Sequence, residues 1–141
     1  MMKYFMFLVG LLLLALPVAA EIPDDLLPEN AKAGIMPGNP LYVFDKIFDN
    51  LRVTFARDKV RASLQVSNER LAEARELSYK GKDFGKTLED SQDWISIAVS
   101  SNGFTSRNIT MDVINKHIAV LQNITVRIAN DNNTANDNAL S

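Results

Sequence analysis

Apolar side chains recur every three or four residues in four stretches of the chain, and this spacing is typical of amphipathic helices. The first stretch begins at Asn39-Pro40, where Asn is a good N-cap and Pro suits the first turn. The second begins near Asp58 and ends at Gly81, a residue suited to the position after a helix. The others cover about 83–100 and 109–129. The pattern predicts an all-α fold, a small antiparallel bundle of three to four helices.

Each predicted helix has one apolar face, which we expect to point into the core. In the first helix this face comprises Leu41, Phe44, Ile47, Phe48, Leu51 and Phe55. In the second it comprises Val60, Leu64, Ser67, Leu71, Ala74 and Ser78. In the third it comprises Phe84, Leu88, Ser91, Ile95 and Ala98. In the fourth it comprises Met111, Ile114, Ile118, Leu121, Thr125 and Ile128.

The charged residues of the second helix lie on its other faces, where we expect a solvated surface. They are Arg61, Glu69, Arg70, Glu73, Arg75 and Glu76. On this interpretation Leu71→Ala destabilises the fold by about 2–5 kcal/mol, as a buried large-to-small change does. Glu73→Ala then stays within about 0.5 kcal/mol, as is usual for a surface substitution.

The N-terminal segment 1–20 has the order of a secretory signal peptide: basic Lys3, an apolar run from Tyr4 to Leu16, and the small residues Val18-Ala19-Ala20. We expect cleavage between Ala20 and Glu21. The mature protein then works outside the cytoplasm, secreted or in the cell envelope. The alternative is an uncleaved segment, which leaves the protein anchored in the membrane.

Two further segments flank the predicted helical domain, 37–129. Pro and Gly interrupt residues 21–36, so we expect an extended leader there. Residues 130–141 are mostly Asn, Asp, Ala and Thr, which bury too little apolar surface to offset the entropy of ordering. We therefore predict a disordered tail at the C-terminus.

Composition narrows the range of functions. The formal net charge is −2, which gives no sign of the basic face that nucleic acids need. The chain has no cysteine, so thiol chemistry, thiolate metal sites and disulfides play no part, although an exported protein could form disulfides.

The stretch Pro37-Gly38-Asn39-Pro40-Leu41-Tyr42 begins a pattern that resembles a known protein family. The pattern continues with Phe55, Asp58 and a charged helix, whose matching residues are Arg61, Ala62, Leu64, Glu69, Arg70, Leu71, Glu73, Ala74, Leu77, Lys80 and Gly81. The family consists of exported prokaryotic proteins, bacterial and archaeal, that carry a domain of unknown function. The resemblance covers Gly34 to about Glu89. It implies an exported helical module, often an accessory part of surface or membrane-associated proteins, with no catalytic role.

No residue pattern indicates catalysis, a cofactor or a metal. His117 is the only histidine, and one histidine without cysteine makes a poor transition-metal site. Glu69, Glu73 and Glu76 alternate with basic residues, which favours an ion-paired surface over an acid–base pair. Three N-x-[S/T] sequons occur near the C-terminus, at Asn108, Asn123 and Asn132. They become glycosylated if the host modifies exported proteins in this way.

The sequence most favours a non-enzymatic module that contacts an envelope protein, or a second copy of itself, through helix faces. The candidate surface lies on the first two helices, at Tyr42, Phe48, Arg52, Arg70 and Glu73. Two alternatives stay open. One is an envelope hydrolase or carbohydrate-active enzyme that uses the carboxylates of the second helix, and the other is a carrier of a small ligand or metal. A closed, dry core opposes both alternatives, and a polar pocket with convergent carboxylates supports them.

Overall fold

A computed structural model of the chain describes residues 21–139, and for 132–139 it describes the backbone alone. These residues form the helices α2 (Tyr42–Phe55), α3 (Lys59–Tyr79), α4 (Gly85–Ser100) and α5 (Arg107–Ala139). Two short 3-10 turns, η1 (Asp24–Leu26) and η2 (Pro28–Asn30), precede them. The described part of the chain contains no strand, so the predicted all-α bundle is confirmed. The predicted signal peptide, 1–20, lies outside the described residues.

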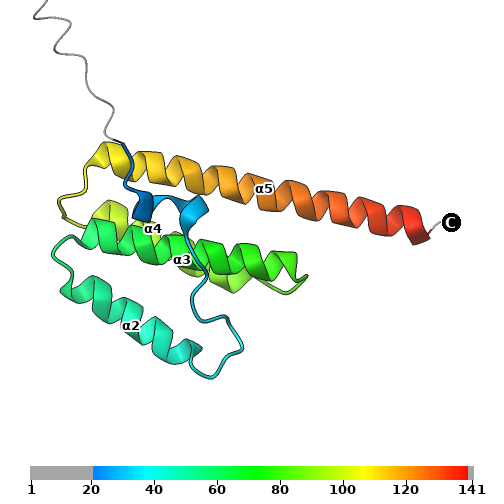
Figure 1. Cartoon of the computed structure of the whole chain (residues 1–141), viewed down its shortest axis with the longest axis horizontal. Coiled ribbons are helices and arrows are strands. Elements are labelled where there is room, and N and C mark those ends of the chain that lie inside the picture. The colour runs from blue at the N-terminus through cyan, green and yellow to red at the C-terminus, as the bar shows by residue number, and fades with distance from the viewer. Residues whose placement is uncertain (1–20, 140–141) are drawn as a thin grey trace, which may run out of the picture.

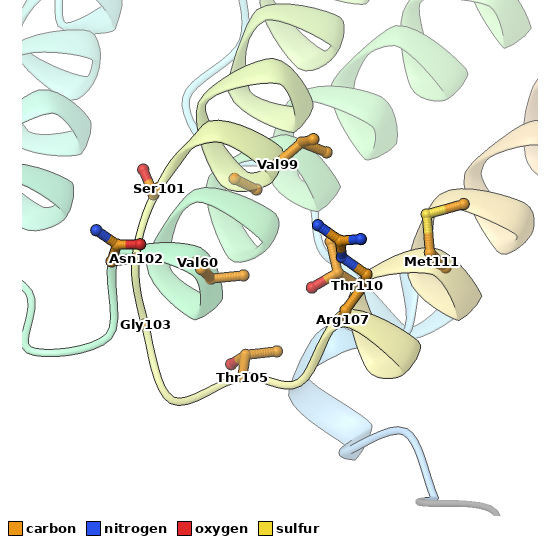
Figure 2. Close-up of a pocket in the computed structure, with 10 residues that line it drawn as sticks. Val60, Val99, Ser101, Asn102, Gly103, Thr105, Arg107, Thr110 and Met111 are labelled. Atoms are coloured by element: carbon orange, nitrogen blue, oxygen red, sulfur yellow. The ribbon is translucent and has the colours of Figure 1, made fainter.

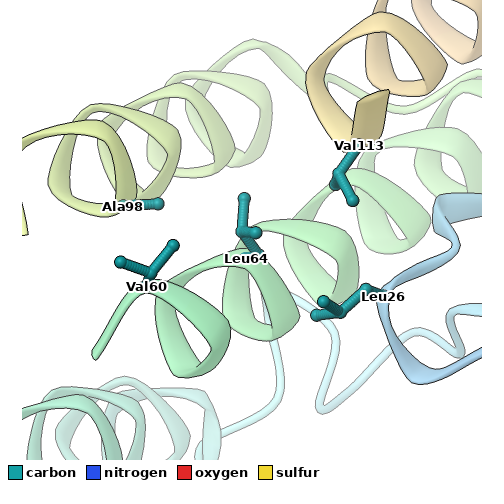
Figure 3. Close-up of a cluster of buried hydrophobic side chains, with 5 residues drawn as sticks. All are labelled: Leu26, Val60, Leu64, Ala98 and Val113. Atoms are coloured by element: carbon teal, nitrogen blue, oxygen red, sulfur yellow. The ribbon is translucent and has the colours of Figure 1, made fainter. Parts of the chain in front are cut away.

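Helix α3 lies at the centre of the bundle. In Figure 1 it runs between α2 and the long α5, with α4 behind it and the η1–η2 segment in front. The many neighbours of α3 explain why it buries residues around most of its circumference rather than along one stripe. One cluster of the hydrophobic core comprises Leu26, Val60, Leu64, Ala98 and Val113, which four different elements bring together (Figure 3).

Local sequence signals set both ends of α3. The Asp58 carboxylate accepts the backbone N–H of Arg61 at 3.0 Å, which makes Asp58 the predicted N-cap. Gly81 has a φ of +61°, a left-handed conformation that costs glycine little. The N–H of Lys82 bonds to the carbonyl of Leu77, and that of Gly81 to the carbonyl of Ser78. These two bonds form a Schellman motif, as expected for a helix that ends before glycine.

The leader is less extended than predicted. Its two 3-10 turns pack on α3, and Leu26 and Pro28 are fully buried there. Asp25 also accepts hydrogen bonds from Arg61 and Gln65 of α3. Apolar burial and these polar contacts together hold the segment against the bundle.

Helix α5 differs from its prediction in two ways. The residues that face the core are Thr110, Val113, His117, Val120 and Ile124, whereas Met111 and Ile118 of the predicted face are about half exposed. The packed face is rotated because Ser67 of α3 offers a hydrogen-bond partner to His117, so that a polar side chain takes a core position. The helix also continues through Ala139, where a disordered tail was predicted. Extending an existing helix costs far less than starting one, and each added residue contributes a hydrogen bond.

Within residues 21–139, no helix is both long and apolar enough to cross a lipid bilayer.

Candidate functional site

The most unusual feature of the molecule is that α2 turns its apolar side outward. We call this surface the α2 face, and it comprises Leu41, Phe44, Ile47, Phe48, Leu51 and Phe55. These six side chains are 45–79 % exposed, although the sequence predicts them to be core. Large contiguous apolar surfaces are rare on monomeric proteins and mark interaction sites. The prediction of an inward apolar face for this helix is therefore wrong.

A buried ion network on the other side of α2 explains this orientation. Arg70 of α3 donates from Nη1 to both carboxylate oxygens of Glu73, at 2.7 and 2.8 Å. Its Nη2 donates to Asp45 at 2.7 Å and to Asp49, and both of these carboxylates belong to α2. Charge-assisted hydrogen bonds of this kind are shorter and stronger than bonds between neutral groups. The polar side of α2 therefore faces α3, and its apolar side is left to solvent.

Three more contacts extend this network toward its surroundings. The Tyr42 ring lies over the Arg70 guanidinium at 5.3 Å, a cation–π arrangement. Lys46 pairs with Asp90 of α4 at 2.6 Å. The N–H of Gly34 donates to Glu73 at 3.2 Å, and a Cβ at Gly34 would lie only 2.9 Å from the same carboxylate oxygen. A glycine is therefore required where the leader crosses the network.

Burial and ion pairing have opposite effects on the pKa of each charged group in the network, and the pKa values of both Arg70 and Glu73 end up raised. Burial lowers the pKa of Arg70, but its hydrogen bonds with Glu73 and Asp45 outweigh burial and raise the pKa above its ordinary value. Burial raises the pKa of Glu73, and the guanidinium of Arg70 opposes that shift only in part. One guanidinium thus holds three carboxylates, so each of them depends on Arg70 for compensation.

These positions correct the interpretation of α3 as a charged surface helix. Arg70 is 1 % exposed and Glu73 is fully buried, so neither can contact a partner directly. Tyr42 is half-buried against Arg70, and Arg52 pairs with Glu69 at the edge of the bundle. Of the candidate surface residues, Phe48 is freely exposed. A sequence signal was available, because Ala62, Val66 and Ala72 place apolar side chains on α3 outside its predicted stripe.

A second buried polar cluster joins α3, α4 and α5. The Nδ1–H of His117 donates to the carbonyl of Val113 at 3.2 Å, and Nε2 lies 3.1 Å from Ser67 Oγ. Ser67 also donates to the carbonyl of Ser91 at 2.8 Å, and the Ser91 hydroxyl donates back to the carbonyl of Ser67. Both serines and His117 are at most 2 % exposed, so a substrate cannot reach this Ser–His pair in the folded domain. The cluster therefore serves packing.

The burial of His117 predicts a pH-dependent stability. Burial lowers the pKa of His117, whereas its bond to Val113 and the nearby Glu29 raise it less. In the unfolded chain His117 has an ordinary pKa of about 6.5. As the pH falls, the unfolded chain therefore binds a proton at a higher pH than the folded chain does. Stability is fully present above that pH and falls as the pH drops below it. Urea unfolding at pH 7.5 and 5.5 should show a loss in the wild type that is smaller in His117→Gln; equal losses contradict this account.

The carboxylates of α3 do not assemble into an acid–base site. Glu69 pairs with Arg52 at 3.1 Å and Glu76 with Lys80 at 2.6 Å, while Glu73 is enclosed with Arg70. Among the described residues, no group of His, Asp and Glu is arranged to hold a metal ion. The geometry therefore gives no support to the alternatives based on convergent carboxylates.

A cavity of about 330 Å³ opens where the α4–α5 loop meets α3. Val60, Val99 and Met111 line it together with the polar residues Thr105 and Arg107 (Figure 2). The two threonine hydroxyls at this cavity are already engaged, Thr105 with Asp58 and Thr110 with the carbonyl of Ser106. The side chains of Arg107, Ser101 and Asn102 also line the cavity.

The predicted sequons lie on α5. Asn108 and Asn123 are exposed, and Asn132 lies where only the backbone is described. A sugar on Asn123 would therefore extend into solvent, and glycosylation stays a prediction.

Fold and site together define a class of protein: a small all-α domain whose central helix carries a buried arginine–carboxylate network and whose α2 displays an apolar face. The sequence matches the family described as Domain of unknown function (DUF5667) over residues 34–136, and the chain belongs to that family. The match begins at Gly34, where the leader meets the network, and includes α2, α3, α4 and most of α5. Searches of curated proteins and of solved structures found no match to this chain.

Proposed function

We propose that this chain is an exported, non-enzymatic interaction module that binds another protein through the α2 face. The observation that carries the proposal is the outward orientation of six apolar side chains on a helix that the domain holds by its polar side. Burial of such a surface is the dominant favourable contribution in most protein–protein association. A partner helix or groove that covers the α2 face gains this contribution.

Two features support a surface that is built for contact. The Arg70 network fixes α2 at two positions, Asp45 and Asp49, one helical turn apart, so the α2 face is presented in one orientation. A preorganised surface loses less conformational entropy when it binds. Export is supported by the signal-like pattern of residues 1–20, which would place the module in the envelope or outside the cell.

Photo-cross-linking in the native host tests this function. A benzoylphenylalanine at position 48 is expected to form protein adducts, because the Phe48 side chain is 67 % exposed at the middle of the α2 face. The matched control is benzoylphenylalanine at position 104, since Phe104 is 86 % exposed but lies outside α2. Adducts several-fold more abundant from position 48 support the proposal. Equal yields from both positions, or adducts with lipid alone, contradict it.

A further inference from the structure

The apolar residues of α2 have the spacing of a helix-pairing seam. Leu41, Phe44, Phe48, Leu51 and Phe55 follow steps of three, four, three and four residues, which are the a and d positions of two heptads. Ile47 lies beside this seam and widens it. An exposed seam of this kind matches another helix better than it matches a flat surface, because its side chains insert between those of a facing helix.

We propose that the α2 face pairs with the α2 face of a second copy of this chain, as two antiparallel helices related by a two-fold axis at Phe48. The inference rests on the proposed function and names its partner. A two-fold interface uses the same surface on both copies, so that surface must be complementary to itself. The order of large and small side chains, the charge and the area of the α2 face all meet this requirement.

The order of side chains favours the antiparallel arrangement. Around an axis at Phe48, Leu41 of one copy lies opposite Phe55 of the other, and Phe44 lies opposite position 52, next to Leu51. Each leucine thus meets a phenylalanine, so large and smaller side chains can interdigitate. A parallel pair instead sets phenylalanine against phenylalanine at three seam positions. Antiparallel helices also place opposite ends of their dipoles side by side.

The charge of α2 removes the main obstacle to self-pairing. All four charged residues of the helix are already paired within the domain: Asp45 and Asp49 with Arg70, Lys46 with Asp90, and Arg52 with Glu69. The α2 face itself is uncharged, so two copies can approach without like-charge repulsion. A membrane-surface helix, by contrast, usually flanks its apolar side with free lysine and arginine. The helix α2 offers no such free cation, which favours a second copy over a lipid surface.

The exposed area agrees with a dimer. The three phenylalanines and three aliphatic side chains of the α2 face are 45–79 % exposed. Because an aromatic side chain buries about 150–250 Å², the three phenylalanines, which are 59–79 % exposed, present roughly 300–500 Å², and the three aliphatic side chains add to this area. A specific protein–protein interface of standard size buries about 800 Å² per partner.

The solution mass of the full chain, purified in the form that its host leaves, tests the pairing. Analytical ultracentrifugation of the wild type at micromolar concentration is expected to give a mass twice that of one chain. Phe48→Asp should raise the dissociation constant roughly thirtyfold or more, as the loss of a central aromatic anchor does. Phe104→Asp is the matched control and should remain dimeric, because its side chain is exposed but distant in sequence from α2. Melting curves of both variants verify that they fold.

Cysteine cross-linking tests the orientation, and the absence of native cysteine makes single-site variants unambiguous. In the Phe48→Cys variant, the cysteine of one chain should form a disulfide with the same cysteine of the second chain, since position 48 lies on the two-fold axis. Leu41→Cys should not form one alone, but should do so when mixed with Phe55→Cys. Efficient self-linking of Leu41→Cys, or none at position 48, overturns the antiparallel pairing.

The outcomes separate this inference from the function on which it rests. A monomeric wild type that still forms Phe48-dependent protein adducts in the host overturns self-pairing and keeps the interaction module. A monomer without such adducts overturns both. Phe48-dependent binding of the monomer to phosphatidylcholine–phosphatidylglycerol vesicles, with no protein adduct, also overturns both, because it makes the α2 face a lipid contact.

Discussion

Arg70→Met is expected to lower the free energy of unfolding by about 3–5 kcal/mol, the range for breaking a buried ion pair from one side. The substitution keeps most of the side-chain volume but removes the guanidinium that neutralises Glu73, Asp45 and Asp49. Glu73 is fully buried, so its carboxylate cannot regain water without opening the α2–α3 interface. Urea unfolding followed by circular dichroism measures the loss, and linear extrapolation gives the free energy in water.

Arg52→Met is the matched control for this prediction. Arg52 also links α2 to α3, through Glu69, but the side chains of this pair are 41 % and 32 % exposed. Exposed pairs contribute only about 0–1 kcal/mol. Similar losses in the two variants would show that the Arg70 network is solvated and does not determine the orientation of α2. Glu73 is fully buried beside Arg70, so the expectation that Glu73→Ala changes stability by only about 0.5 kcal/mol is wrong.

Leu26→Ala is expected to cost about 2–5 kcal/mol, which is the range for a buried leucine replaced by alanine. Leu26 comes from the leader, yet it is fully buried against Val60, Leu64 and Val113. Its loss leaves a cavity between the leader, α3 and α5, because the rigid helices around it cannot collapse into the space. The midpoint of thermal or urea unfolding reports the change.

The neighbouring residue supplies the control. Leu27 is only half-buried, so Leu27→Ala removes the same atoms from a site that is partly in water already. Its cost should be clearly smaller than that of Leu26→Ala. Two small and equal costs would mean that the leader is not part of the folded domain, despite its 3-10 turns.

The central network also has a structural consequence for α2. The only apolar residue of α2 that is buried is Val53, which packs with Ala62 and Val66. The apolar core therefore does little to choose between the two sides of the helix. Asp45 and Asp49 determine which side faces inward, because both are paired with Arg70. If α2 turned over, these pairs would break and leave buried charge without a partner. The same arrangement that stabilises the contact exposes the α2 face.

The sequence by itself determined the helices and several of their ends. The apolar period predicted all four helices, and Asp58 and Gly81 marked the two ends of α3. These features depend on residues a few positions apart, so local hydrogen bonding and backbone preference are sufficient to predict them. The apolar stripe of α3 was likewise found correctly at Val60, Leu64 and Leu71.

Only the tertiary structure decided which sides of the helices are buried. The apolar pattern of α2 indicated a core face, but Arg70, 21 residues beyond Asp49 in the chain, holds the opposite side inward. On α5, Ser67 likewise draws His117 into the core and rotates the helix away from its most apolar face. In both cases a buried polar group must find its partner, and that partner lies on another helix. Amphipathicity within one helix reports where its apolar surface lies, whereas the polar partners across the bundle determine whether that surface is covered or displayed.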